Sequence, residues 1–266
     1  MAMLEGQVAI VTGAGRGFGK AIALRYAREG ARVAVSARTR AQLDEVVAEI
    51  EASGGRALAV SGNITSASDI ANLIDETQRE LGPIGVIVSN AGVPWPFGPL
   101  WVNDPDKWWA AQEVHIKAPM MLMRAALPGM IERRGGRIIL VSAIASHLTV
   151  SGLSAYIVGK SAQKRLGEVL AVETKEHGIS VFSIDPGFVF TQLAADTMNS
   201  PDAQRWLPQM VAGLKRMADG PPQDGDLEKC AQRCLDLASG RYDALSGGYF
   251  ELPDDLDKML KEKQTA

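Results

Sequence analysis

Thr12-Gly13-Ala14-Gly15-Arg16-Gly17-Phe18-Gly19 directly follows the apolar run Val8-Ala9-Ile10-Val11, and a helical pattern from Gly19 to Glu29 comes next. A strand, a glycine-rich turn and a helix in this order bring backbone N–H groups and the positive end of the helix to a pyrophosphate. The stretch therefore predicts the nucleotide site of an α/β fold. Its candidate cofactor residues are Gly13, Gly15, Arg16, Gly17, Phe18 and Gly19.

Short β-branched runs alternate with longer helical patterns along the rest of the chain. We expect strands at Gln7–Thr12, Arg32–Ser36, Arg56–Val60, Ile84–Ser89, Arg137–Ser142, Ile179–Ile184 and Tyr249–Leu252. We expect helices at Gly19–Glu29, Arg40–Ala52, Ala67–Leu81, Asp104–Arg133 and Ser154–His177. Strands that are apolar throughout are typical of a parallel sheet covered on both faces. The fold class predicted is α/β, a Rossmann-type doubly wound, seven-stranded parallel sheet with helices on both faces.

The length of the chain predicts one large core. Its 266 residues are 46% hydrophobic, which suits a single domain over residues 1–266. The cofactor half then covers about residues 1–135, and the catalytic and substrate half about residues 136–266. Residues 191–226 interrupt the alternation with prolines and glycines among apolar residues. Such an insertion is either a lid over substrate or a contact between subunits, and its apolar content favours the lid.

Charge and cysteine content exclude several classes of protein. A net charge of -3 argues against binding to nucleic acid or to an anionic membrane. Cys230 and Cys234 are the only cysteines, which indicates a reducing compartment and no disulfide framework. With no further Cys or His nearby, they suggest ordinary helix residues rather than metal ligands, and we expect no metal. We also expect no signal peptide, no membrane span and a cytoplasmic location.

Tyr156-Ile157-Val158-Gly159-Lys160 places a phenol and an ammonium one helical turn apart on the same face of a helix. A free phenol has a pKa of about 10, and a neighbouring ammonium lowers that pKa by favouring phenolate. Together with the T-G-x-x-x-G-x-G spacing of the glycine turn, this motif resembles the short-chain dehydrogenase/reductase family over nearly the whole chain. The resemblance implies hydride transfer with a nicotinamide, Tyr156 as acid/base and Lys160 bound to the nicotinamide ribose. It also implies a homodimer or homotetramer.

The end of the second predicted strand indicates which nicotinamide nucleotide is bound. Ser36-Ala37-Arg38-Thr39-Arg40 contains no acid that could bind a ribose 2′-hydroxyl, and Arg16 lies in the glycine turn. Guanidinium groups bind phosphate strongly through bidentate contacts. We therefore predict NADP(H), held by Arg16 and Arg38. The alternative is that Arg38 and Arg40 are the solvated start of a helix.

Other positions match the family's cofactor contacts, with departures. Asn63-Ile64 stands where the family usually has Asp-Val against the adenine, and Ser89-Asn90-Ala91-Gly92 stands for Asn-Asn-Ala-Gly. Asp185-Pro186-Gly187, followed by Val189 and Thr191, resembles the segment that holds the nicotinamide carboxamide, with Asp185 in place of the usual Asn. The resemblance thus assigns cofactor contacts to Asn63, Ile64, Asn90, Ala91, Gly92, Pro186, Gly187, Val189 and Thr191, besides Tyr156 and Lys160.

Two residues that support the tyrosine in the family are altered. The family serine that hydrogen-bonds the reacting oxygen corresponds to Ala143, thirteen residues before Tyr156. Ser142, Ser146 and His147 are candidate replacements, and Ser142 can serve only if the strand end bulges or unwinds, since adjacent strand residues point to opposite faces. His115 stands where the family has an asparagine in a proton relay to the lysine. Because histidine titrates near neutrality, His115 could join that relay; alternatively, it satisfies a backbone carbonyl.

These residues predict an NADP(H)-dependent oxidoreductase that interconverts a ketone and a secondary alcohol. Its catalytic candidates are Tyr156, Lys160, Ser142 and His115. The alternative is an NADP(H)-binding relative with weak or no activity that acts as a binding or regulatory module. An aromatic group predicts a largely apolar or aromatic substrate: Trp95, Phe97, Trp101, Trp108 and Trp109. Packing against a partner subunit explains Trp108 and Trp109 equally well.

Overall fold

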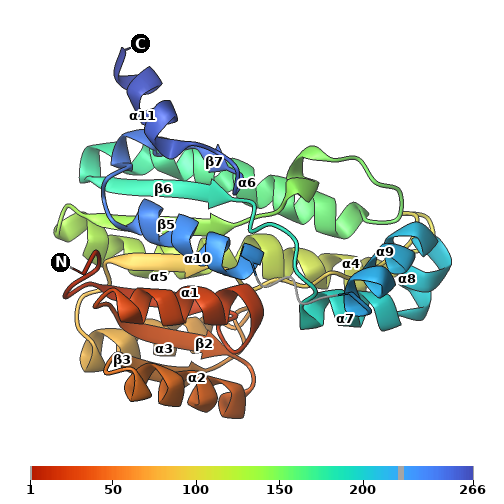
Figure 1. The fold of residues 1–266 in the computed structure, drawn as a ribbon, viewed down its shortest axis with the longest axis horizontal. Coiled ribbons are helices and arrows are strands. Elements are labelled where there is room, and N and C mark those ends of the chain that lie inside the picture. Colours follow the sequence, from red (N-terminus) through yellow and green to blue (C-terminus); the bar gives the residue numbers. More distant parts are fainter. Residues whose placement is uncertain (1, 221–224, 266) are drawn as a thin grey trace.

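Seven parallel strands form one sheet in the order β3-β2-β1-β4-β5-β6-β7 (Figure 1). The computed structural model describes residues 2–220 and 225–265. The strands are β1 (Val8–Thr12), β2 (Arg32–Ala37), β3 (Arg56–Ser61), β4 (Val86–Ser89), β5 (Gly136–Val141), β6 (Ile179–Ile184) and β7 (Tyr249–Phe250). The chain reverses its direction of travel across the sheet between β1 and β4, which is where such sheets bind ligands. The predicted fold class is confirmed.

Helices cover both faces of the sheet. On one face lie α1 (Gly17–Arg28), α2 (Arg40–Ala52) and α10 (Gly225–Ala238); on the other lie α3 (Ala67–Glu80), α5 (Ala118–Glu132) and α6 (Ser154–Thr174) (Figure 1). Side chains of a strand alternate between the two faces. In β1, Ala9 and Val11 therefore enter the core beneath α1, whereas Val8 and Ile10 enter the opposite core.

Arginine side chains shorten two of the strands relative to the sequence prediction. The predicted strand Ile84–Ser89 begins only at Val86, and Arg133 donates a 2.9 Å hydrogen bond to the Ile84 carbonyl. The last strand ends at Phe250 rather than Leu252, whose carbonyl accepts a 3.0 Å bond from Arg233. In both places the backbone carbonyl accepts its hydrogen bond from a guanidinium group and not from the N–H of a neighbouring strand.

The predicted helix Asp104–Arg133 consists of three consecutive pieces. It begins as α4 (Pro105–Gln112), continues as a π-helical turn, η1 (Glu113–Lys117), and ends as α5. Asp104 caps α4 by accepting hydrogen bonds from the backbone N–H groups of Asp106 and Lys107. π-turns inside helices are frequent at functional sites, and this one contains His115.

The segment predicted as a lid forms three short helices beyond the carboxyl ends of the strands: α7 (Gln192–Asn199), α8 (Pro201–Trp206) and α9 (Pro208–Ala218) (Figure 1). Residues 221–224 of the predicted segment lie outside the described residues. Helices α8 and α9 are attached through an apolar cluster, which we call the lid cluster, of Phe97, Leu153, Ala203, Leu207 and Val211, and Met198 of α7 packs against it. Leu153 immediately precedes α6, so this predicted lid segment packs next to the turn that contains Tyr156.

Both cysteines are buried in the core between α10 and the sheet. The Cys234 carbonyl accepts a 2.9 Å hydrogen bond from the hydroxyl of Tyr26 on α1. Within residues 2–220 and 225–265, no group of three or more His, Cys, Asp or Glu side chains is arranged to hold a metal ion. In the same residues no helix has both the length and the apolar character needed to cross a bilayer.

Candidate active site

The glycine turn between β1 and α1 has a backbone that other residues would strain. Gly13 and Gly17 have φ angles of 64° and 56°, which favour glycine. A Cβ atom on Gly19 would lie only 2.4 Å from the Gly13 carbonyl oxygen. Glycine at these positions therefore lets the chain turn tightly from the strand into the helix, as the sequence predicted.

The first turn of α1 is suited to an anion. Its N-cap residue, Arg16, makes no side-chain cap, and the first turn has no acidic residue. The first N–H groups of a helix have no partner within the helix, and the helix dipole favours a negative charge beside them. The tight turn and this helix start together fit the pyrophosphate of a dinucleotide.

Thr12 and Asn90 join the glycine turn to the end of β4. The Asn90 side-chain amide donates to the carbonyls of Thr12 (2.9 Å) and Gly13 (3.2 Å). In return, the Thr12 hydroxyl accepts from the backbone N–H groups of Asn90 (3.0 Å) and Ala91 (3.2 Å). Asn90 thus fixes the shape of the cofactor turn from the neighbouring strand. The sequence analysis gave Thr12 no role.

Three arginines near the carboxyl end of β2 differ in what they bind. Arg40 pairs with Asp44 at 2.7 Å, and Arg16 lies 4.0 Å from Asp196 on α7. Arg38 is exposed and has no ion-pair partner among the described residues. Of the three, Arg38 has a guanidinium that no other side chain of the described part of the chain engages.

The other predicted cofactor residues lie along the same carboxyl edge of the sheet. Thr191 faces the glycine turn: a Cβ atom on Gly17 would lie 3.4 Å from the Thr191 methyl group. Pro186 and Val189 are buried, and Gly187 has a φ angle of 79°. Beyond β3, Asn63 is exposed, and its side-chain oxygen accepts two hydrogen bonds from Thr65, while Ile64 packs on the core.

Tyr156 and Lys160 lie together near the start of α6, over the end of β5. Lys160 is 4% exposed, and its Nζ lies 5.8 Å from the centre of the Tyr156 ring. Nζ donates to the Val141 carbonyl at 2.8 Å and to Oε1 of Gln163 at 3.3 Å. The structure therefore brings the predicted tyrosine and lysine together and adds Gln163, which the sequence analysis did not identify.

Ser142 lies near Lys160, and its hydroxyl is bound to the backbone of that residue. Its Oγ donates to the Lys160 carbonyl at 3.0 Å, and its backbone N–H continues the strand pairing with Ile184. The strand neither bulges nor unwinds before Ser142, so this hydroxyl braces α6 against β5. Ala143, at the family's serine position, is extended and 8% exposed.

The other two candidate donors turn toward β7. The His147 ring packs against the Tyr249 ring, with their centres 4.6 Å apart. The Ser146 hydroxyl is buried and has no hydrogen-bond partner among the described residues, and it lies close enough to Tyr249 to affect its pKa. Both residues belong to the short helix η2 (Ile144–His147), which follows the end of β5.

The pKa values of the tyrosine and the lysine differ from the sequence expectation. Burial raises the pKa of Tyr156 to about 12, and the negative charge of Asp185 adds to this. We expected the Tyr156 pKa to be lowered by Lys160, but burial has the larger effect and raises it. Burial lowers the pKa of Lys160 itself to about 7, against the opposing effect of Asp185. Without ligand, Tyr156 is therefore a protonated phenol at neutral pH.

Asp185 is a site residue that the sequence analysis noted only as a departure from the family pattern. It follows β6 directly, and its Oδ1 accepts a 3.0 Å hydrogen bond from the backbone N–H of Ile144. That bond ties the segment after Ala143 to the end of β6. Burial raises the pKa of the Asp185 carboxyl, and the carboxylates of Glu251 and Asp226 add to this effect.

His115 packs edge-on against Tyr156, with ring centres 5.5 Å apart. Its Nε2 hydrogen-bonds the Val93 carbonyl at 2.9 Å, while its Nδ1 is buried without a partner among the described residues. Burial and the charge of Lys160 lower the pKa of His115 to about 3, so the expectation that it titrates near neutrality is wrong. A Cβ on Gly92 would lie 3.3 Å from His115 Cε1 and 3.6 Å from Lys160 Nζ, so this glycine keeps a space beside both residues.

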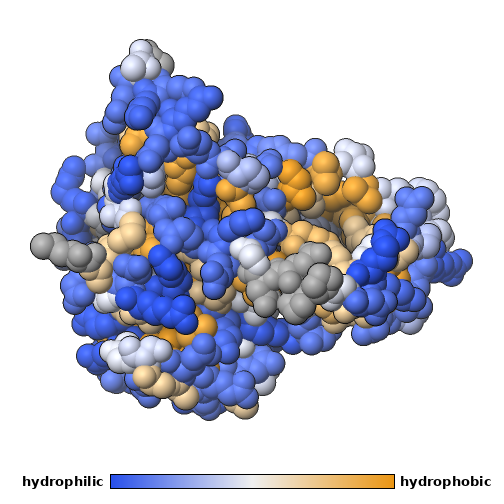
Figure 2. Space-filling view, viewed as in Figure 1, coloured by the Kyte–Doolittle hydropathy of each residue, from blue (hydrophilic) through white to orange (hydrophobic). Residues whose placement is uncertain are grey.

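Large apolar side chains surround the entrance to this region. The segments after β4, β5 and β6 all expose such side chains, among them Trp95 (38% exposed), Ile144 (39%) and Phe188 (59%). In Figure 2, hydrophobic surface gathers around a hollow beside α7, α8 and α9.

The aromatic residues predicted to line one substrate pocket lie in different environments. Phe97 belongs to the lid cluster, and the Trp108 indole donates to Ser154 at 3.1 Å, joining α4 to α6. Trp101 and Trp109 are mostly exposed.

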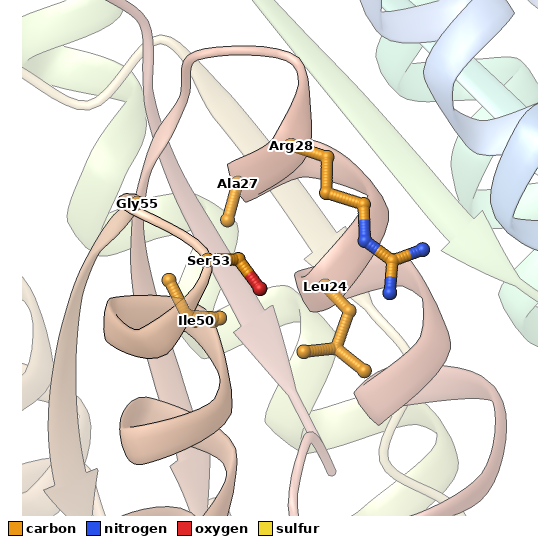
Figure 3. Close-up of a pocket in the computed structure, with 6 residues that line it drawn as sticks. All are labelled: Leu24, Ala27, Arg28, Ile50, Ser53 and Gly55. Atoms are coloured by element: carbon orange, nitrogen blue, oxygen red, sulfur yellow. The ribbon is translucent and has the colours of Figure 1, made fainter.

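A second hollow lies at the opposite end of the sheet. It is a cavity of about 10 Å³ between the C-terminal ends of α1 and α2, lined by Leu24, Ala27, Arg28, Ile50, Ser53 and Gly55 (Figure 3). A space of this size holds at most one water molecule. This cavity is therefore too small for a dinucleotide.

The family model described as short chain dehydrogenase matches residues 7–202. The chain belongs to the short-chain dehydrogenase/reductase family. It is an oxidoreductase of a family that uses the nicotinamide nucleotides NAD(P)(H) and acts on small molecules. The predicted family membership is confirmed.

Relatives of this short-chain dehydrogenase/reductase cover most of its length. It is 34% identical to a short chain dehydrogenase of Pseudocercospora fijiensis, over 98% of this chain and 84% of that protein. It is 33% identical to a 3-oxoacyl-acyl-carrier-protein reductase of Synechocystis, over 81% of this chain and 90% of that protein. The crystal structure of a short-chain type dehydrogenase/reductase from Mycobacterium marinum superposes with a TM-score of 0.78 at 28% identity, covering 93% and 94% of the two chains.

Proposed function

We propose that this protein is an NADPH-dependent reductase of bulky, largely apolar ketones, with Tyr156 as the proton donor. The observation that supports this most strongly is the protonated Tyr156 phenol, beside the buried Lys160, at the edge of the sheet that also holds the glycine turn. A phenol that keeps its proton at neutral pH is ready to act as an acid. This favours reduction of a carbonyl over oxidation of an alcohol.

The residues of the chain divide the chemistry among them. The bound nicotinamide supplies the hydride. Tyr156 donates its proton to the carbonyl oxygen as that oxygen gains negative charge. Lys160 provides an ammonium whose charge stabilises the phenolate left behind. The lid cluster, which packs next to Tyr156, limits the access of water to the reacting atoms.

His115 is proposed to hold, as a hydrogen-bond acceptor, the water that returns a proton toward Lys160 after each turnover. Its low pKa keeps the ring neutral, so that Nε2–H donates to Val93 and Nδ1 is left as an acceptor. The space beside Gly92 adjoins both His115 and Lys160, and it suits a bridging water. A neutral histidine thus replaces the family's asparagine as a fixed hydrogen-bonding group.

The preference for NADP(H) rests on Arg38. Its exposed guanidinium lies at the end of β2, where an adenosine ribose meets the second strand in dinucleotide folds. Arg16 approaches the same ribose from the glycine turn. Arg40, paired with Asp44, takes no part.

Subunit contacts are proposed through the outer surface of α6, in keeping with a homodimer or homotetramer. Val158, Val169 and Val172 are exposed there, with Val172 at 77%. Exposed valines on a helix that packs its other side on the core suit burial against a second copy.

A panel of ketones followed by NADPH absorbance tests the proposed function directly. Turnover of bulky apolar ketones with NADPH, and weaker turnover of polyhydroxy compounds, is the expected result. The absence of a serine hydroxyl at Ala143 favours one competing function, an NADP(H)-binding protein with weak or no turnover. That alternative is correct if NADPH binds but no compound on the panel reacts.

Restoring the missing hydroxyl with Ala143→Ser is expected to raise kcat. A preorganised donor beside the reacting oxygen is typically worth about 10²–10³-fold in kcat, and Ala143 is the residue at the family's serine position. The matched control is Ala145→Ser, which adds the same hydroxyl two residues later. Steady-state rates on one ketone compare the two. An unchanged kcat in Ala143→Ser would show that another group already serves the reacting oxygen.

A further inference from the structure

Gln163 is a buried amide whose one hydrogen bond among the described residues is to the site. It is 0% exposed, and its Oε1 accepts from Lys160 Nζ at 3.3 Å. Its Nε2 is buried and has no partner among the described residues. An unsatisfied buried amide group destabilises a fold, and methionine or leucine would fill the same space without that penalty. The hydrogen bond to Lys160 is therefore the one feature that glutamine supplies at this position and that methionine or leucine would not.

The position of Lys160 Nζ is determined from two directions. The backbone of Lys160 is held to β5 because Ser142 donates to its carbonyl. From this fixed backbone, the side chain returns to β5 and donates to the Val141 carbonyl. Gln163 lies three residues further along α6, on the same face, and supplies the second acceptor. An ammonium has three N–H donors, so two are taken and one is left for a ligand.

We propose that Gln163 is a positioning residue that keeps Lys160 protonated and directs its third N–H toward the ligand. This inference rests on the proposed function, because it concerns the lysine used there. An amide oxygen accepts a hydrogen bond from an ammonium, and it gains far less from a neutral amine. Gln163 thereby opposes the loss of the Lys160 proton that burial favours.

The other groups around Lys160 do not replace Gln163. His115, from η1, is neutral because its pKa is about 3, and Tyr156, on α6, is neutral because its pKa is about 12. Asp185, after β6, is the carboxylate whose charge acts on Lys160, and it is fixed by its bond to Ile144. Near pH 7, Lys160 is thus the group of this set whose charge responds most to a lost acceptor.

Two substitutions with opposite expected effects test the proposal. Gln163→Met keeps the length of the side chain and removes the acceptor, so the pKa of Lys160 falls by about one unit. Gln163→Glu replaces the amide with a carboxylate, so that pKa rises by a similar amount or more. The pKa is measured in the intact protein by NMR titration of lysines labelled at 13Cε, with the Lys160→Met spectrum assigning the signal. Gln163→Leu repeats the first arm if Gln163→Met does not fold.

The result expected is a pair of opposite shifts, accompanied by opposite shifts in the alkaline limb of kcat/KM. Equal Lys160 titrations in the three proteins, or two shifts of the same sign with a lower Tm, would overturn the proposal and leave Gln163 a packing residue. The NMR readout does not need turnover. If the shifts appear while no ketone reacts, the inference about Gln163 stands and the proposed reductase function fails.

Discussion

Replacing Tyr156 with phenylalanine is expected to lower kcat by about 10²- to 10⁴-fold, the range for losing a positioned acid. The ring remains, so its edge-on contact with His115 and the fold should be kept. NADPH affinity should change much less than kcat, because most of the predicted cofactor contacts lie on other residues, in the glycine turn and after β2, β3, β4 and β6. Single-turnover rates and an NADPH titration by fluorescence separate the two effects.

Tyr249→Phe is the matched control for this substitution. Tyr249 is on β7, and its hydroxyl is buried without a partner among the described residues, so its removal should leave kcat unchanged. If Tyr156→Phe retained most of the wild-type kcat, Tyr156 would not be the proton donor. The proposed mechanism would then be wrong at its central step.

Arg38→Ala is expected to lower kcat/KM with NADPH by about 10- to 100-fold, the loss of one charge-assisted hydrogen-bonded contact. The same variant should leave kcat/KM with NADH nearly unchanged, because NADH has no 2′-phosphate. Measuring both cofactors on the same ketone gives the change in preference directly.

Arg40→Ala controls for the general loss of a positive charge near β2. Arg40 already pairs with Asp44 at 2.7 Å, so its removal should leave the ratio of NADPH to NADH activity within about twofold. Equal losses with NADPH and NADH in Arg38→Ala would mean that Arg38 does not read the 2′-phosphate. A wild type that prefers NADH would contradict the proposed cofactor at the outset.

The fold could be predicted from the sequence because its determinants are local. Strands β1, β4, β5 and β6 are apolar runs rich in β-branched residues, and the glycines of the Gly13–Gly19 turn mark where the chain enters α1. Helix α2 begins and ends at the predicted residues Arg40 and Ala52. Several strand boundaries differ by one residue. The two that differ by two residues lie where arginines distant in the sequence, Arg133 and Arg233, bind the carbonyls concerned.

The site could be predicted only in part, because hydrogen-bond partners and burial depend on the whole fold. Spacing on one helix was enough to bring Tyr156 and Lys160 together. The sequence did not indicate that Lys160 Nζ would bind Gln163 and Val141, or that burial would keep Tyr156 protonated and His115 neutral. The available signal for Gln163 was its position three residues after Lys160 on the same helix, and its role can be inferred only once the structure places Lys160 Nζ beside it.

Because of the π-turn η1, the number of residues between α4 and α5 cannot change even by one without rotating one helix relative to the other. It winds more residues into one turn than an α-helix does, so α5 is rotated by about 100° from the phase that α4 would otherwise impose. With this rotation, Trp108 on α4 points to Ser154 and Leu122 on α5 points into the core. Deleting one residue from Glu113–Lys117 would leave a continuous α-helix. In that helix only one of the two side chains, Trp108 or Leu122, could still point toward its partner. Apart from His115, this stretch should therefore tolerate exchanges of residue type far better than insertions or deletions.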